Sequence, residues 1–97
     1  MSRRTTAIHE HSRPKLAAKV RLRFDRREQR FMLLCPERGL QLNDAATEVL
    51  QCCTGHYTIE MIVDTLSAKH PECPRELISN DAVTFIAQLR SRGLIEE

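Results

Sequence analysis

Apolar and charged residues alternate near the start of the chain, and this alternation predicts a β-strand. Over residues 20–25 the apolar Val20, Leu22 and Phe24 are separated by charged side chains. A period of two is typical of a strand with one buried and one solvated face. Residues 26–29 are all polar, so a turn is expected to follow this strand.

The next segment, residues 30–35, differs because both of its alternating faces are apolar. One face can contact the core of the domain, while Met32 and Leu34 on the other face need a cover from a further segment, a second subunit or a partner. Pro36 ends this strand because proline cannot donate to a ladder. Residues 39–42 predict a short third strand.

From residue 43 onward the apolar spacing changes to the i, i+3, i+4 period of helices. Asn43 or Asp44 is suited to cap the first helix and Thr58 the second, while Gly55 and Gly93 are placed as left-handed helix stops. The three apolar stripes are Ala46, Val49, Leu50 and Cys53, then Ile59, Ile62, Val63 and Leu66, then Ile78, Ala82, Phe85, Ile86 and Leu89.

These elements predict an α+β domain with the order β-β-β-α-α-α. A length of 97 residues favours one domain, expected over residues 16–97, preceded by a flexible basic arm over residues 1–15. Leu94 and Ile95 form an apolar tail that is expected to fold back onto the helices.

The net charge of +2 conceals a difference between the two parts of the chain. Residues 1–31 carry ten Lys and Arg against three Asp and Glu, whereas residues 32–97 carry five against ten. A basic end can attract anionic partners. Because three helices with a small sheet also describe a winged helix, nucleic-acid binding is one alternative, although the predicted helices carry few basic residues where a recognition helix needs them.

The cysteines are expected to be reduced thiols in a cytoplasmic protein. The N-terminus has no apolar signal segment, and no C-x-x-C spacing suggests zinc among Cys35, Cys52, Cys53 and Cys73. No apolar run approaches the ~20 residues that a membrane-spanning helix needs.

Catalytic and cofactor motifs are missing from the sequence. The three glycines are all assigned to turns or helix stops, which leaves none for a phosphate-binding loop. The pair Asp44 and Glu48 is interpreted as a solvated helix face, and His56 and His70 as helix-end residues. We therefore expect a binding protein without catalytic residues, cofactor or metal.

Several segments together resemble the family of pyrroloquinoline quinone (PQQ) biosynthesis protein D, over roughly residues 13–97. The telling parts are Arg-Pro at residues 13–14, PER-x-x-x-L-N over residues 36–43 and R-G-L-I over residues 92–95. The pair Cys52-Cys53 departs from the small or apolar residues expected there. No single motif is specific, but their order and spacing carry the resemblance.

The resemblance implies a winged-helix-like peptide chaperone that recognises a ribosomally made precursor peptide and presents it to a radical S-adenosylmethionine enzyme. In such domains the peptide pairs with the third strand and lies along the third helix, by addition to an exposed sheet edge. Carried over by position, the peptide-binding residues are Leu40, Gln41, Leu42, Asp81, Phe85, Gln88 and Arg92.

Three further hypotheses remain open. One is the nucleic-acid-binding winged helix described above. Another is direct binding of the quinone product, whose carboxylates would meet Arg21, Arg23 and Arg30. A homodimer is also compatible with the second apolar face of residues 30–35, which a second copy would cover, with or without exchange of strands.

Overall fold

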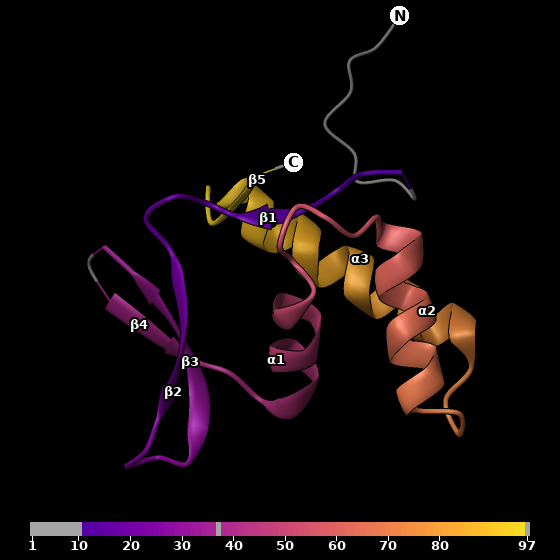
Figure 1. Ribbon diagram of the computed structural model, residues 1–97, viewed down its shortest axis with the longest axis horizontal. Coiled ribbons are helices and arrows are strands. Elements are labelled where there is room, and N and C mark those ends of the chain that lie inside the picture. The colour runs from indigo at the N-terminus through magenta and orange to yellow at the C-terminus, as the bar shows by residue number, and fades with distance from the viewer. Residues whose placement is uncertain (1–10, 37, 97) are drawn as a thin grey trace, which may run out of the picture.

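A three-stranded sheet at one end of the molecule and three helices at the other follow the order that the hydrophobic pattern predicted (Figure 1). The computed structural model describes residues 11–36 and 38–96. Its elements are β1 (Lys15–Leu16), β2 (Arg21–Asp25), β3 (Arg30–Cys35), β4 (Arg38–Gln41), α1 (Asp44–Gln51), α2 (Ile59–Lys69), α3 (Arg75–Ser91) and β5 (Ile95–Glu96).

The sheet is antiparallel with the order β2-β3-β4, so β3 is central. Leu33 in β3 lies opposite Leu22 of β2 and Leu40 of β4, and these three residues form the inner face of the sheet. The outer face alternates with it and carries Met32 and Leu34. The predicted strand with two apolar faces is therefore the central strand.

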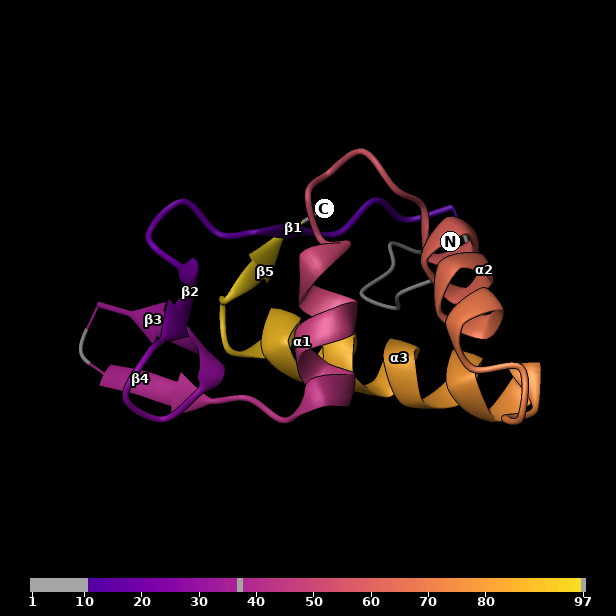
Figure 2. The same ribbon diagram turned by 60° about the horizontal axis from the view of Figure 1, so that its bottom comes forward.

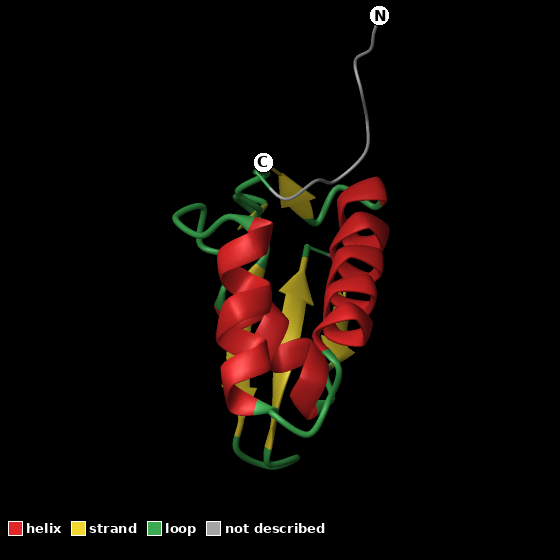
Figure 3. Ribbon diagram, turned by 90° about the vertical axis from the view of Figure 1, so that its right-hand side faces the viewer, coloured by secondary structure: helices red, strands yellow, loops and turns green. Residues whose placement is uncertain are grey.

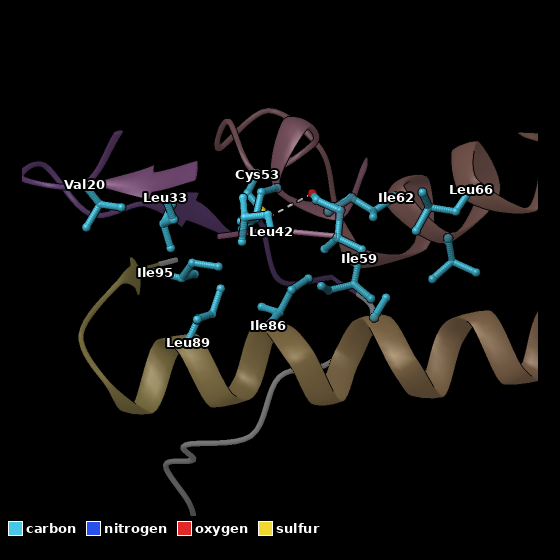
Figure 4. Packing of buried hydrophobic residues seen from close by; sticks show 14 residues of the cluster. Val20, Leu33, Leu42, Cys53, Ile59, Ile62, Leu66, Ile86, Leu89 and Ile95 are labelled. Atoms are coloured by element: carbon cyan, nitrogen blue, oxygen red, sulfur yellow. Dashed lines mark hydrogen bonds between the residues drawn. The ribbon is translucent and has the colours of Figure 1, made fainter. Parts of the chain in front are cut away.

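One hydrophobic core joins the sheet to the helices. Figure 4 shows Ile86 and Leu89 of α3 pointing toward Leu33, Leu42 and Ile95. All five side chains are at most 7% exposed. In Figure 3 the helices stand in front of the strands, so only the inner face of the sheet is turned toward them.

The predicted caps begin the first two helices. The Asn43 side chain accepts a hydrogen bond from the Ala46 amide at 2.8 Å, which satisfies a free donor in the first turn of α1. Thr58 does the same for α2 by accepting from the Met61 amide at 3.1 Å. No helix in the described ranges is long and apolar enough to span a bilayer.

The two predicted glycine stops have different roles. Gly93 has φ +76° and follows α3, where its amide donates to the Arg90 carbonyl and the Leu94 amide donates to that of Leu89. This is the Schellman arrangement expected for a helix stop.

Gly55 was predicted to end the first helix, and that role is wrong. Helix α1 ends at Gln51, and turn hydrogen bonds close it before Gly55 is reached. Gly55 has φ +89°, its amide donates to the Pro14 carbonyl at 2.9 Å, and an added Cβ would lie 3.3 Å from Lys15 Cδ. Its left-handed conformation therefore serves the close approach of the N-terminal segment.

The structure adds a short strand pair that the sequence pattern did not predict. β1 pairs with β5, with Leu16 opposite Ile95, so the apolar tail does fold back and is fixed there by the N-terminal segment. Ser12 and Pro14 are also buried, and the Ser12 carbonyl accepts from the Ile59 amide at 2.9 Å. The packed domain thus extends N-terminal to residue 16 as far as Ser12, while residues 1–10 of the expected arm lie outside the described residues.

Candidate peptide-binding site

Strand β4 has an open edge. It is hydrogen-bonded to β3 on one side and to no other strand in the described part of the chain (Figure 2). The Leu42 amide donates to the Phe31 carbonyl at 3.1 Å, and the register places Leu40 opposite Leu33. Because bonded and non-bonded pairs alternate in an antiparallel ladder, the N–H and C=O groups of Gly39 and Gln41 point away from β3. We call these four backbone groups the open edge.

The three predicted residues of this segment divide between core and surface. Leu42 is 7% exposed and belongs to the core, and the half-buried Leu40 packs against the core. Their side chains are thus committed to the domain itself. Gln41 is exposed on the outer face, and its side-chain oxygen lies 3.4 Å from a guanidinium nitrogen of Arg30. This segment can therefore offer a peptide its backbone and the Gln41 side chain.

A groove of about 550 Å³ begins where β4 leads into α1. We call it the α1–α3 groove, because α1 and α3 form its walls and the C-terminal part of α2 closes one end. Its lining residues are Asn43, Asp44, Ala45, Ala46, Glu48, Val49, Leu66, His70, Cys73, Ile78, Asp81, Ala82 and Phe85. The predicted residues Asp81 and Phe85 lie in this groove.

The other two predicted helix residues do not line the groove. Gln88 is exposed, and its backbone carbonyl accepts a hydrogen bond from the Ser91 hydroxyl at 2.8 Å. Arg92 is the exposed C-cap residue of α3. Both lie further along the helix toward β5, so the structure divides the four predicted α3 residues into a groove pair and a distal pair.

Three carboxylates give the α1–α3 groove an acidic rim around an apolar floor. Asp44 and Asp81 are exposed, while Glu48 is half-buried. The apolar lining includes Val49, which belongs to the core, and Phe85, which packs against the core. The groove can therefore accept an apolar side chain together with a positively charged one.

The sequence did not predict that His70 bridges two helices. His70 is the C-cap residue of α2, and its Nε2 lies 2.7 Å from Glu48 Oε1 on α1. Glu72 lies 3.7 Å from its Nδ1. The hydrogen bond to Glu48, assisted by both negative charges, raises the pKa of His70 above its ordinary value of 6.5. Twenty-two positions separate His70 from Glu48, so no local pattern could reveal the pair.

All four cysteines are free thiols, as the sequence predicted. Cys53 is 3% exposed and its thiol donates to the Val49 carbonyl at 3.3 Å. Burial raises the pKa of Cys53 to about 12, so the thiol stays protonated and behaves as a small apolar side chain. Cys73 lines the α1–α3 groove. Among the described residues, no three His, Cys, Asp or Glu side chains are grouped so that they could hold a metal ion.

The chain matches the family model described as coenzyme PQQ synthesis protein D (PqqD) over residues 30–95. That match begins at the first residue of β3 and runs into β5. A relative from Rhodopseudomonas palustris (strain HaA2), named PqqA binding protein, is 37% identical over 97 residues, which cover all of this chain and 94% of the relative.

Two solved structures are similar as well. The solution structure of the PqqD truncation of Methylobacterium extorquens PqqCD, described as a functional and stand-alone recognition element for ribosomally synthesized and post-translationally modified peptides, is 32% identical with a TM-score of 0.79. The alignment covers 95% of this chain and 97% of that one. The crystal structure of PqqD from Xanthomonas campestris is also 32% identical, with a TM-score of 0.57 and coverage of 94% and 100%. With its order of antiparallel strands followed by three helices, the chain belongs to the PqqD family.

Proposed function

We propose that this protein binds the precursor peptide PqqA as an added strand on the open edge of β4. The observation that carries the proposal is the open edge itself, which adjoins the α1–α3 groove through Asn43 and Asp44. The name of the Rhodopseudomonas relative, PqqA binding protein, supports the same peptide as the ligand.

The open edge supplies affinity without sequence selectivity. Gly39 and Gln41 each offer one N–H and one C=O, and a peptide in strand conformation can pair with all four. Each such bond contributes about 0.5–1.5 kcal/mol net, because the groups exchange water for peptide. Selectivity must then come from side-chain contacts beside the strand.

The α1–α3 groove is suited to provide those contacts. Phe85 and the other apolar lining residues can bury a hydrophobic side chain of the peptide. Asp44 and Asp81 lie on the rim, where they favour a lysine or arginine nearby in the peptide. The proposed ligand segment is therefore extended near β4 and carries apolar and basic side chains toward the groove.

The protein acts by presenting the peptide, and the chemistry belongs to a partner. The sequence offers no catalytic motif, and among the described residues the groove holds no cluster of metal ligands. The proposed partner is a radical S-adenosylmethionine enzyme that modifies the peptide. Holding the peptide in one extended conformation lowers the entropy that the enzyme must remove.

A titration of ¹⁵N-labelled protein with synthetic PqqA peptide tests the site. We expect the amides of residues 39–43 and 78–85 to shift on binding. Replacing Gln41 by proline removes one outward N–H without touching the bonds between β4 and β3, so affinity should fall by about tenfold or more. The control Gln41→Ala loses the side chain but keeps that N–H, so it should bind the peptide more tightly than Gln41→Pro.

A second control separates binding from folding. The Leu40 amide points toward β3, so Leu40→Pro should lower the unfolding midpoint, whereas Gln41→Pro should leave it nearly unchanged. If Gln41→Pro binds the peptide as tightly as the parent protein, the peptide does not add to β4.

A further inference from the structure

The outer face of the sheet, turned away from the core, combines arginines with an apolar centre. Arg21 lies opposite Leu34 and Arg23 lies opposite Met32 in the register of β2 and β3. The turn after β2 adds two more arginines. We call this surface the basic sheet face, and it consists of Arg21, Arg23, Arg26, Arg27, Met32 and Leu34.

The apolar centre lies in a shallow hollow of about 680 Å³. Met32 and Leu34 are only half-buried, and they line this hollow together with Arg23, Phe24, Asp25, Arg26 and Arg27. A half-buried methionine and leucine on a sheet face retain apolar surface that a partner can cover.

Among the described residues, the arginines of this face form no ion pair with an acidic side chain. Within the described ranges no ion pair involves Arg21, Arg23, Arg26 or Arg27. The nearby Asp25 carboxylate instead accepts hydrogen bonds from the backbone amides of Arg27 and Glu28, at 2.9 and 3.3 Å, which fixes the turn. The charges on this face are therefore available to an external carboxylate.

The basic sheet face reaches the open edge of β4 through Gly39. A Cβ atom at Gly39 would lie 2.9 Å from Met32 Cε and 3.3 Å from Leu34 Cδ2, so both side chains lean over the space that glycine leaves. The apolar centre thus continues to the strand on which the peptide is proposed to add. A partner seated on this face would lie next to the bound peptide.

We infer that the basic sheet face docks an acidic patch with an apolar centre on the enzyme that modifies the bound peptide. The inference rests on the proposed function and assigns the partner its own surface, separate from the α1–α3 groove. Carboxylates on the partner would pair with Arg21 and Arg23, and an apolar side chain would cover Met32 and Leu34. The enzyme would then meet the peptide from the outer side of β4.

The positive charge of the basic sheet face favours an acidic partner protein over a second copy of the chain. Two basic sheet faces brought together would juxtapose unpaired arginines, which is repulsive. A nucleic acid would satisfy the charges but would leave the apolar centre without a matching contact, since sequence-independent binding depends on phosphate contacts alone. An acidic protein surface with an apolar centre satisfies both components.

The test measures the affinity of the purified radical S-adenosylmethionine enzyme for the full-length protein, with and without PqqA peptide. The variant Arg21→Glu/Arg23→Glu should bind the enzyme at least about tenfold more weakly, because two attractive charges become repulsive. The control Lys69→Glu/Arg75→Glu makes the same charge change at the end of α2 and the start of α3, and should bind within about twofold of the parent. Figure 1 shows the connection between these two helices at the end of the molecule opposite the sheet. A second variant, Met32→Ser/Leu34→Ser, tests the apolar centre and should also weaken enzyme binding.

Peptide affinity, measured on the same samples, reports that each variant is folded and keeps the proposed function separate from the inference. Retained peptide binding with weakened enzyme binding supports the basic sheet face. Retained peptide binding with unchanged enzyme binding overturns it, whether the arginines prove to bind duplex DNA at low salt or to mediate self-association. Failure of the parent protein to bind the peptide would instead overturn the proposed function.

Discussion

The two edges of the same sheet differ in a way that explains where a peptide can add. β2 (Arg21–Asp25) has charged residues at three of its five positions, whereas β4 (Arg38–Gln41) has one in four. Charged side chains on an edge strand oppose pairing with another chain, because each must stay hydrated while a neighbour approaches. β4 instead presents Gly39 and Gln41, which cost little to cover.

The two edges of the sheet also lie next to surfaces of opposite charge. The protected edge adjoins the arginines of the basic sheet face, and the open edge adjoins the acidic α1–α3 groove. A peptide with apolar and basic side chains is therefore favoured at one edge and disfavoured at the other. The central strand β3 holds both edges in place, so substitutions there should affect the two together.

The largest expected effect comes from Leu33→Ala in the central strand. Leu33 is 0% exposed and lies opposite Leu22 and Leu40, so its truncation leaves a cavity beneath both edges. We expect a loss of about 3 kcal/mol in the free energy of unfolding, measured by urea denaturation. Leu77→Ala, at a residue that is 52% exposed, should cost less than about 0.5 kcal/mol. Equal effects of the two substitutions would contradict this assignment of the core.

A smaller loss of stability is expected from removing either N-cap, and the two caps should differ in their effect on peptide binding. Asn43→Ala and Thr58→Ala each remove one N-cap and should each cost about 1 kcal/mol. Asn43 also lines the α1–α3 groove next to β4, whereas Thr58 begins α2. Asn43→Ala should therefore weaken PqqA binding as well, while Thr58→Ala should not. Equal peptide affinity of the two variants, measured by calorimetric titration, would remove Asn43 from the site.

Removing the charged side chains from β2 should allow this edge strand to pair with a second copy of the chain. The double variant Arg21→Val/Arg23→Val retains strand propensity but loses the hydrated side chains. We expect self-association to increase about tenfold, seen as a higher mean mass in light scattering across a concentration series. Lys69→Val is the control on a helix and should leave the mean mass unchanged. A monomeric double variant would show that charge does not protect β2.

The smallest effect concerns the pH dependence of the contact between α1 and α2. Because the pKa of His70 is raised in the folded state, protonated His70 stabilises the fold, fully at pH values below its ordinary 6.5. This contribution is lost as the pH rises through the raised pKa. The urea midpoint of the parent protein, relative to that of His70→Gln, should therefore decrease as the pH rises above the ordinary pKa of 6.5. A parallel pH dependence in the two proteins would show that Glu48 does not hold the histidinium.

Local sequence pattern was sufficient for the elements that depend on local energetics. The alternation around Leu22 and the helical stripe through Ile62 predicted the right element types, because burial requires those periods. Thr58 was recognised as a cap because a cap involves only the next three residues, and the structure chooses Asn43 over Asp44, the other candidate for the first helix. Asp81 and Phe85 came from the family resemblance and not from the local pattern. Both line the α1–α3 groove, and their contact with a peptide stays a prediction.

Features that depend on distant segments could not be predicted in the same way. Gly55 has its positive φ because Pro14 and Lys15 lie against it, and no helix-stop pattern contains that information. The pairing of Leu16 with Ile95 joins two-residue strands that are too short to show a period. The His70–Glu48 bridge likewise depends on how α1 and α2 pack.

The pairing of β1 with β5 has a consequence for how this domain can be connected to other polypeptides. The β1–β5 pair brings together two segments from near the two ends of the described chain, and Figure 1 shows this pair apart from β4. A linker attached after β5 would therefore start away from the open edge and leave it uncovered. A tethered enzyme would meet the bound peptide at an effective concentration set by linker length, in the millimolar range for short flexible linkers. The fold is thus suited to work equally as a free adaptor or as a covalently appended one.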